Sequence, residues 1–217
     1  MFPNLSTGTK NLFKSQILGI ISAVLLSAGL VAALFSFTPE RIMSADTSAV
    51  VVGIITLVGL LLLILSAAWE IFGLAICRKD DRRFSTLIIL TIVCILIRIL
   101  SVVLAGTVPG GGDSMWIILL GHLSTWINII TAEISVIYFI DALKKEGDEV
   151  QVYSGRNIQI ILNVLLIAEI LLAFIANFDG FEGSVANGLN VAIAVMEVFF
   201  YILYISFLSR ISKQFNH

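Results

Sequence analysis

Charged side chains are scarce in this 217-residue sequence: Asp, Glu, Lys and Arg make up 13% of it, whereas hydrophobic residues make up 59%. A typical soluble domain has about 25% charged and about 45–50% apolar residues. The shortage of charge therefore excludes an ordinary water-soluble globular protein. It predicts that the lipid bilayer is a partner along most of the chain.

Several functional signatures are also missing. There is no basic tail, no basic patch interleaved with aromatic residues and no Gly-Lys phosphate loop, which excludes nucleic-acid and nucleotide binding. Two cysteines and two histidines are too few for a metal framework, so neither a metal nor a cofactor is expected. Cys77 ends one apolar stretch, while Cys94 lies roughly 15 Å into the next, so no disulfide between them is expected.

The chain does contain long apolar stretches, each able to cross the hydrocarbon core, for which about 20 helical residues suffice. They cover residues 15–37, 50–77, 85–108, 115–140, 158–178 and 186–208. The first is too long for a signal-peptide core and is expected to persist as a helix. We therefore predict an all-α integral membrane protein, a bundle of six transmembrane helices forming a single membrane domain over residues 1–217.

The distribution of basic residues predicts the orientation of these helices. If both termini are cytoplasmic, the inner segments hold eleven of the thirteen Lys and Arg residues. The outer loops then hold only Arg41, and the remaining arginine is inside the membrane. Because lysine and arginine concentrate in cytoplasmic loops, this bias favours cytoplasmic N and C termini. The expected compartment is the cytoplasmic membrane of a bacterium.

The first two stretches carry small residues on one face at helical spacing, which lets membrane helices pack closely. In the first stretch these are Ser15, Gly19, Ser22, Gly29, Ala33 and Ser36; in the second, Gly59, Ser66 and Gly73 recur every seven residues. The alternative interpretation of the first face is a docking surface for a partner membrane subunit.

An arginine, Arg98, lies near the middle of the third stretch. A charge at that depth costs several kcal/mol unless it pairs or reaches water. The polar and small residues of this stretch share its face, at steps of three or four residues: Leu87, Thr91, Cys94, Arg98, Ser101 and Ala105. This face should therefore contact other helices or a wet cavity, and the aliphatic remainder should face lipid.

Four other stretches each carry one glutamate: Glu70, Glu133, Glu169 and Glu197. Counted along the spans, Glu169 and Glu197 lie at the depth of Arg98, whereas Glu133 and Glu70 lie nearer the cytoplasm. We therefore expect a cluster of Arg98 with Glu169 or Glu197 near the bilayer midplane. Neutral hydrogen-bonding groups that could complete a site are His122, Asn128, Asn190 and Tyr201.

Two functions remain open for this charge cluster. One is binding or transport of a small solute or ion, because several carboxyls against one guanidinium exceed what structural pairing requires. The other is a non-transporting scaffold or accessory subunit whose arginine–glutamate pairs only hold the helices together. A polar cavity that reaches Glu169 and Glu197 would favour the first, and a solid bundle the second.

The spacing of charges raises the additional hypothesis of three two-helix repeats. Glu70, Glu133 and Glu197 are 63 and 64 residues apart, and Ser27, Arg98 and Glu169 are 71 apart. Units of two spans would share one orientation, as in parallel-repeat transporters. Almost no other residue matches across the three units.

No catalytic residues are predicted. The sequence from Gly110 to Asp113 resembles the Gly-x-Gly-Asp motif of intramembrane aspartyl proteases. The second aspartate available to it, Asp141, falls at the opposite membrane face, so the two carboxyls could not share a water molecule. We therefore do not expect an enzyme.

Overall fold

The structure is a computed structural model that describes residues 2–36, 47–107, 115–176 and 184–215, with the side chains of 27, 29–36, 47–50, 105–106, 184–187 and 190 left out. The described residues form six α-helices and no strands, as the sequence predicts. The helices are α1 (Pro3–Ser36), α3 (Thr47–Cys77), α4 (Phe84–Thr107), α5 (Met115–Glu146), α6 (Glu149–Ala176) and α7 (Ser184–Gln214).

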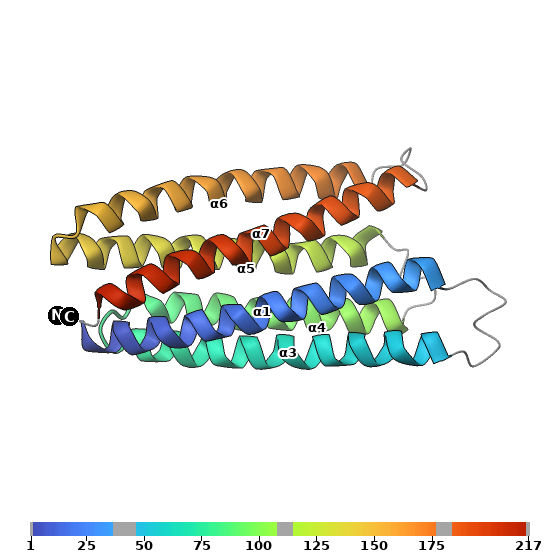
Figure 1. The fold of residues 1–217 in the computed structure, drawn as a ribbon, viewed down its shortest axis with the longest axis horizontal. Coiled ribbons are helices and arrows are strands. Elements are labelled where there is room, and N and C mark those ends of the chain that lie inside the picture. The colour runs from blue at the N-terminus through green and yellow to red at the C-terminus, as the bar shows by residue number, and fades with distance from the viewer. Residues whose placement is uncertain (1, 37–46, 108–114, 177–183, 216–217) are drawn as a thin grey trace.

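The six helices lie lengthwise beside one another and form a closed ring in chain order (Figure 1). Each helix packs against the next one along the chain, and α7 packs against α1. Among these neighbouring pairs, α1 and α3 share the most extensive contact and α3 and α4 the least extensive. Both termini lie at one end of the bundle, which we call the terminal end (Figure 1).

Five helical segments are long and apolar enough to cross a membrane, counted over the described residues alone. They are Val51–Cys77, Phe84–Leu104, Met115–Glu146, Glu149–Ala176 and Val191–Gln214. Their outer faces are strongly aliphatic; Ile89 and Leu96, for example, are 61% and 60% exposed. Such faces suit lipid rather than water, so the helices are those of a polytopic membrane protein.

Several helices are longer than the apolar stretches that predict them. Helix α1 begins at Pro3 rather than at residue 15, and α5 and α6 together take up most of the hydrophilic segment expected to be a loop after residue 140. The reversal between α5 and α6 needs only two residues. Gly147 adopts φ of +80°, which glycine permits without strain, and Asp148 accepts a hydrogen bond from the Gln151 N–H at 3.1 Å, capping α6.

Small residues mediate the α1–α3 contact, which confirms the predicted packing face from Ser15 to Ser22 and from Gly59 to Gly73. Side-chain packing at Gly29, Ala33 and Ser36, which complete the predicted face of the first stretch, lies outside the described part of the structure. The Ser22 hydroxyl donates to the carbonyl of Gly59 at 2.8 Å, and the Ser66 hydroxyl donates to the carbonyl of Ser15 at 2.7 Å. Nearer the terminal end, a Cβ on Gly8 would lie 2.9 Å from the carbonyl oxygen of Gly73. Only glycine allows the two backbones to come this close.

Helix α5 is the most buried of the membrane-length helices. In its apolar 18-residue stretch 50% of the residues are buried, compared with 11% in α3 and in α4. Its hydroxyl groups also link it to α7, because Ser135 and Tyr204 share a hydrogen bond between their side chains. This contact keeps both hydroxyl groups away from lipid.

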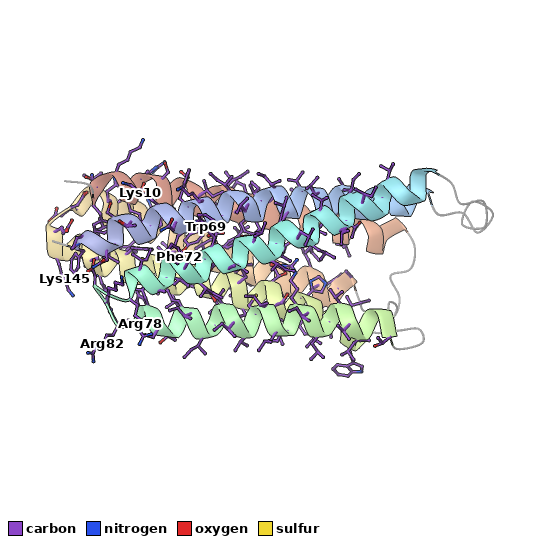
Figure 2. The ribbon with its side chains drawn as sticks, turned by 90° about the horizontal axis from the view of Figure 1, so that it is seen from below. Lys10, Trp69, Phe72, Arg78, Arg82 and Lys145 are labelled. Atoms are coloured by element: carbon purple, nitrogen blue, oxygen red, sulfur yellow. The ribbon has the colours of Figure 1, made fainter. Side chains whose placement is uncertain are left out.

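The terminal end carries basic residues that are widely separated in the sequence. Lys10, Arg78, Arg82 and Lys145 gather there (Figure 2). A fifth basic residue, Arg83, ties the α3–α4 connection to α5.

Arg83 makes this link through two carboxylates and a ring. Its guanidinium lies 2.7 Å from Asp81 and 2.8 Å from Asp141, and it covers the ring of Tyr138 at 4.8 Å. Hydrogen bonds from the Arg83 side chain lower the pKa of Asp81 below its ordinary value. The α3–α4 connection is therefore held against α5 by the ion pairs and the ring contact of Arg83.

Candidate functional site

A cavity of about 230 Å³ lies between α3 and α4, with α5 and α7 behind it. We call it the α3–α4 cavity. Its polar lining consists of Ser66 and Glu70 from α3, Thr91, Cys94 and Arg98 from α4, Asn128 from α5 and Tyr201 from α7. Four helices therefore meet around Arg98, the arginine within the third apolar stretch.

The two charged residues of the cavity differ in how they are satisfied. Glu70 accepts a hydrogen bond from the side-chain amide of Gln16 on α1, at 3.4 Å. Arg98 has no ion pair within 4.0 Å and no hydrogen bond to any residue that the structure describes. A guanidinium at membrane depth is costly without a partner. The hydrogen-bond donors of the Arg98 side chain are therefore available to a ligand in the cavity.

A buried hydroxyl in the same lining is also incompletely satisfied. Thr91 is 6% exposed, lies seven residues or about two turns from Arg98 on the same face of α4, and interacts with the Glu70 carboxyl, although its Oγ1 makes no hydrogen bond of normal geometry within the described residues. Buried hydroxyls are normally hydrogen-bonded, because an unmade bond costs about 1–3 kcal/mol. Thr91 is therefore a second incompletely satisfied polar group of the cavity, nearer to Glu70 than to the backbone position of Arg98.

The remaining polar groups of the cavity are already paired behind it. The Cys94 thiol donates to the carbonyl of Ser124 at 3.1 Å, and the Asn128 amide donates to the Tyr201 hydroxyl at 3.4 Å. These contacts join α4 to α5 and α5 to α7. They hold the inner wall of the cavity in place.

Glu197 does not line the cavity but lies near its polar lining. Arg98, Glu70 and Glu197 all lie close enough to the Cys94 and Tyr201 side chains to interact with them electrostatically. Glu197 itself accepts a hydrogen bond from the Thr125 hydroxyl at 3.1 Å. It therefore contributes to the electrostatics of the site without forming part of the cavity wall.

Glu169 belongs to a different location, between α5 and α6. Its side chain is 2% exposed, and its Oε1 lies 4.0 Å from Nδ1 of His122 without making a hydrogen bond. The His122 ring stacks on Trp126, whose ring in turn stacks on Phe174. The Trp126 N–H is buried and has no partner in the described part of the chain either. Glu169, His122 and Trp126 therefore form a second set of buried polar side chains, separate from Arg98.

The other predicted site residues are distributed as follows. Glu133 accepts a hydrogen bond from the Asn163 amide at 2.8 Å, between α5 and α6. The side chain of Asn190 lies outside the described part of the structure. The structure thus brings Arg98, Glu70, Asn128 and Tyr201 together around one cavity, and it does not place Glu169 or Glu133 there.

Four residues of the site were not among the site residues predicted from the sequence. Thr91 and Cys94 were identified only as part of the inward face of their helix, Ser66 only as part of a packing face, and Gln16 was not singled out. Gln16 follows Ser15 on the small-residue helix, and its buried side chain, 2% exposed, reaches Glu70 on the next helix. A long polar side chain within a predicted span is a signal that could have identified it.

The cavity opens sideways between α3 and α4, toward the outer face of the bundle. Its mouth is formed by aliphatic side chains that are more than half exposed: Ile64, Ile99 and Val102, at 57%, 51% and 52%. The two helices diverge from their short connection at the terminal end (Figure 2). The opening therefore faces the side of the bundle that suits lipid.

The described residues contain no group of three or more His, Cys, Asp or Glu side chains able to hold a metal ion. Comparisons with protein families, with curated proteins and with solved structures find no match for this chain. The geometry of the α3–α4 cavity is therefore the feature of the molecule that bears on function.

Proposed function

We propose that this multi-pass membrane protein binds a small solute in the α3–α4 cavity, as a solute-binding or transport component. The observation that carries the proposal is the guanidinium of Arg98, which lines the cavity without an ion pair or hydrogen bond in the described residues. A ligand that pairs with Arg98 would remove the cost of leaving the guanidinium unsatisfied. Uptake through the site would be driven by an ion gradient or by a partner membrane subunit.

The proposed topology has six spans with cytoplasmic N and C termini. Support comes from the end of the bundle where both termini, the α3–α4 connection and the α5–α6 connection lie together (Figure 1). Basic residues from the first part of α1, from the α3–α4 connection and from the end of α5 gather there (Figure 2), as the positive-inside rule requires of a cytoplasmic face. The bacterial cytoplasmic membrane remains the proposed compartment.

The hypothesis of three two-helix repeats remains part of this proposal. The hairpins α1–α3, α4–α5 and α6–α7 would each enter and leave the membrane in the same sense, as parallel repeats do. Superposition of the three hairpins tests it, and clearly different tilts would contradict it.

A non-transporting scaffold is the second candidate. Two of the intramembrane carboxyls favour it, because Glu133 and Glu197 are both hydrogen-bonded to neutral side chains and act as links between helices. The cavity beside Arg98 weighs against it. A scaffold would not need an unpaired guanidinium in a cavity that opens to the outside.

Native mass spectrometry of the gently purified chain tests the proposal. We expect wild-type protein to carry a small-molecule adduct, and Ala67→Phe to lose it, because Ala67 lines the cavity and the larger ring would fill it. Ala68→Phe is the matched control, since Ala68 is exposed on the same helix and does not line the cavity. A wild type without any adduct, or equal adducts in both variants, would count against solute binding at this site.

A further inference from the structure

The α3–α4 cavity is divided into a polar inner part and an aliphatic mouth. Arg98 and Thr91 stand among its polar lining, whereas Ile64, Ile99 and Val102 are exposed at the mouth. We infer that the ligand of the cavity is a membrane amphiphile with a single anionic group, which enters sideways from the bilayer between α3 and α4. This inference rests on the proposed function and names its substrate class.

The anionic group follows from the state of Arg98. A guanidinium stays protonated at all physiological pH values and offers planar, paired N–H donors that match a carboxylate or a phosphate ester. None of these donors is used within the described residues. The Thr91 hydroxyl, about two helical turns away on the same face, is a further polar group of the lining, beside Glu70.

The single charge follows from the number of cationic side chains in the lining. Arg98 is the one cationic side chain that lines the cavity. It can neutralise one negative charge on a ligand, whereas a second would be left without a cationic partner in a site of low dielectric constant. A monoanion is therefore favoured over a dianion.

The apolar tail follows from the mouth and from the size of the cavity. Ligand pockets for drug-sized molecules enclose about 300–1,000 Å³, whereas this cavity encloses about 230 Å³. The cavity can therefore enclose the polar head and the first part of a chain. The rest of the chain would lie along the exposed aliphatic side chains of α3 and α4, in the hydrocarbon of the bilayer.

The lateral route follows from what lies between the cavity and the terminal end. Leu74 of α3 lies one turn from Glu70 toward that end, and Leu87 of α4 lies one turn from Thr91; the two residues are 1% and 0% exposed. Both belong to the hydrophobic core of the bundle. An aqueous solute arriving from the terminal end would have to pass through this core, whereas an amphiphile in the bilayer reaches the mouth directly.

Binding of three probes to the full chain in lipid nanodiscs tests the ligand class. Radiolabelled dodecanoate combines a monoanion with a chain; dodecanol lacks the charge, and acetate lacks the chain. We expect dodecanoate to bind the wild type at least tenfold more tightly than either of the others. Arg98→Gln should weaken dodecanoate at least tenfold, and Arg82→Gln, an exposed arginine outside the cavity, should leave it unchanged.

A second pair of variants tests the route without altering the packed interior. Ile99→Trp places a bulky ring at the exposed mouth and should slow dodecanoate association severalfold. Leu96→Trp is its control, because Leu96 is also exposed to lipid, on the same helix, but does not line the cavity. Equal association rates in the two variants would contradict lateral entry between α3 and α4.

The remaining outcomes separate this inference from the proposed function. If acetate binds as tightly as dodecanoate, the site is one for small aqueous anions. If dodecanol binds as tightly as dodecanoate, Arg98 does not select for a negatively charged ligand. If no probe binds while wild type still carries an adduct that Ala67→Phe loses, the amphiphile class is overturned and solute binding stands. If no probe binds and the wild type carries no adduct, the amphiphile inference and the proposed solute binding are both overturned.

Discussion

The carboxylate of Asp80, in the connection between α3 and α4, caps the first turn of α1 through Asn4. It accepts the backbone N–H of Asn4 at 2.8 Å and the side-chain amide of Asn4 at 2.7 Å, and it also accepts the N–H of Leu5 at 2.8 Å. The first N–H groups of a helix have no partner within the helix, and the N-terminus favours a negative charge. One side chain more than 70 residues away in sequence therefore fixes the start of α1.

Replacing this cap should destabilise the protein. Asp80→Ala leaves the N–H groups of Asn4 and Leu5 to water, and we expect a loss of about 1–2 kcal/mol in the free energy of unfolding. Asp80→Asn keeps an acceptor but loses the charge, so its cost should be smaller. Thermal unfolding in detergent measures both, with the exposed Lys79→Ala as control; an effect no larger than that of the control would mean that the cap is not needed.

The closest approach of α1 and α3 should not tolerate a methyl group. A Cβ on Gly8 would overlap the Cys77 sulfur and lie 2.9 Å from the Gly73 carbonyl oxygen. Because a backbone atom cannot move aside cheaply, Gly8→Ala should destabilise the protein by about 1–3 kcal/mol.

Gly53→Ala on α3 is the matched control for that substitution. No atom lies within 4 Å of a Cβ built there, so this change should be neutral or slightly stabilising, by up to about 1 kcal/mol, from helix propensity. The two midpoints of thermal unfolding are compared in the same detergent. A Gly8→Ala midpoint equal to that of Gly53→Ala would show that the two backbones can separate without cost.

The buried carboxyl of Glu169 should be dispensable for stability. Its Oε1 has no hydrogen bond in the described structure and lies 4.0 Å from His122. Burying this carboxyl costs free energy that no hydrogen bond to Oε1 offsets, so the uncharged and similarly shaped Glu169→Gln should leave the unfolding midpoint unchanged or raise it. The same change at exposed Glu146 serves as control. A loss of more than about 1 kcal/mol would show that the carboxylate and His122 form a stabilising ion pair.

The charged connection at the terminal end should make stability depend on acid pH. Arg83 lowers the pKa of Asp81 below its ordinary 3.8. The stabilisation is therefore complete above about pH 4 and is lost as the pH falls through the depressed pKa of the folded state. Asp81→Asn removes this titrating group, so its unfolding midpoint should fall less steeply than that of wild type between about pH 4 and pH 2. Parallel curves for the two proteins would contradict the assignment; Glu146→Gln, which is exposed, should follow wild type.

Periodicity along single helices was sufficient to predict much of the architecture. The predicted inward face of α4 is confirmed, because Leu87 and Thr91 are buried while Ile89 and Leu96 are exposed. The small-residue contact between α1 and α3 was also correct. Both features depend only on the angle of 100° per residue, which the sequence specifies directly.

Pairing between helices was harder to predict, because depth along a span does not say which helices are neighbours. Glu169 matches Arg98 in depth, yet α6 and α4 do not adjoin in the ring and Arg98 has no ion pair with it. Glu70, counted as nearer the cytoplasm, is on α3, which adjoins α4, and it lines the same cavity as Arg98. The order of helices around the ring is a property of the whole bundle, and no local pattern encodes it.

Closure of the ring by α1 and α7 has a consequence for assembly. Tyr201 of α7 forms part of the cavity wall and lies so close to Gly19 of α1 that a Cβ there would be 2.8 Å from its ring. During synthesis α7 emerges after the other five helices. The binding wall is therefore completed at the last docking step, and a nascent chain that has inserted only its earlier helices holds Arg98 without an enclosing site.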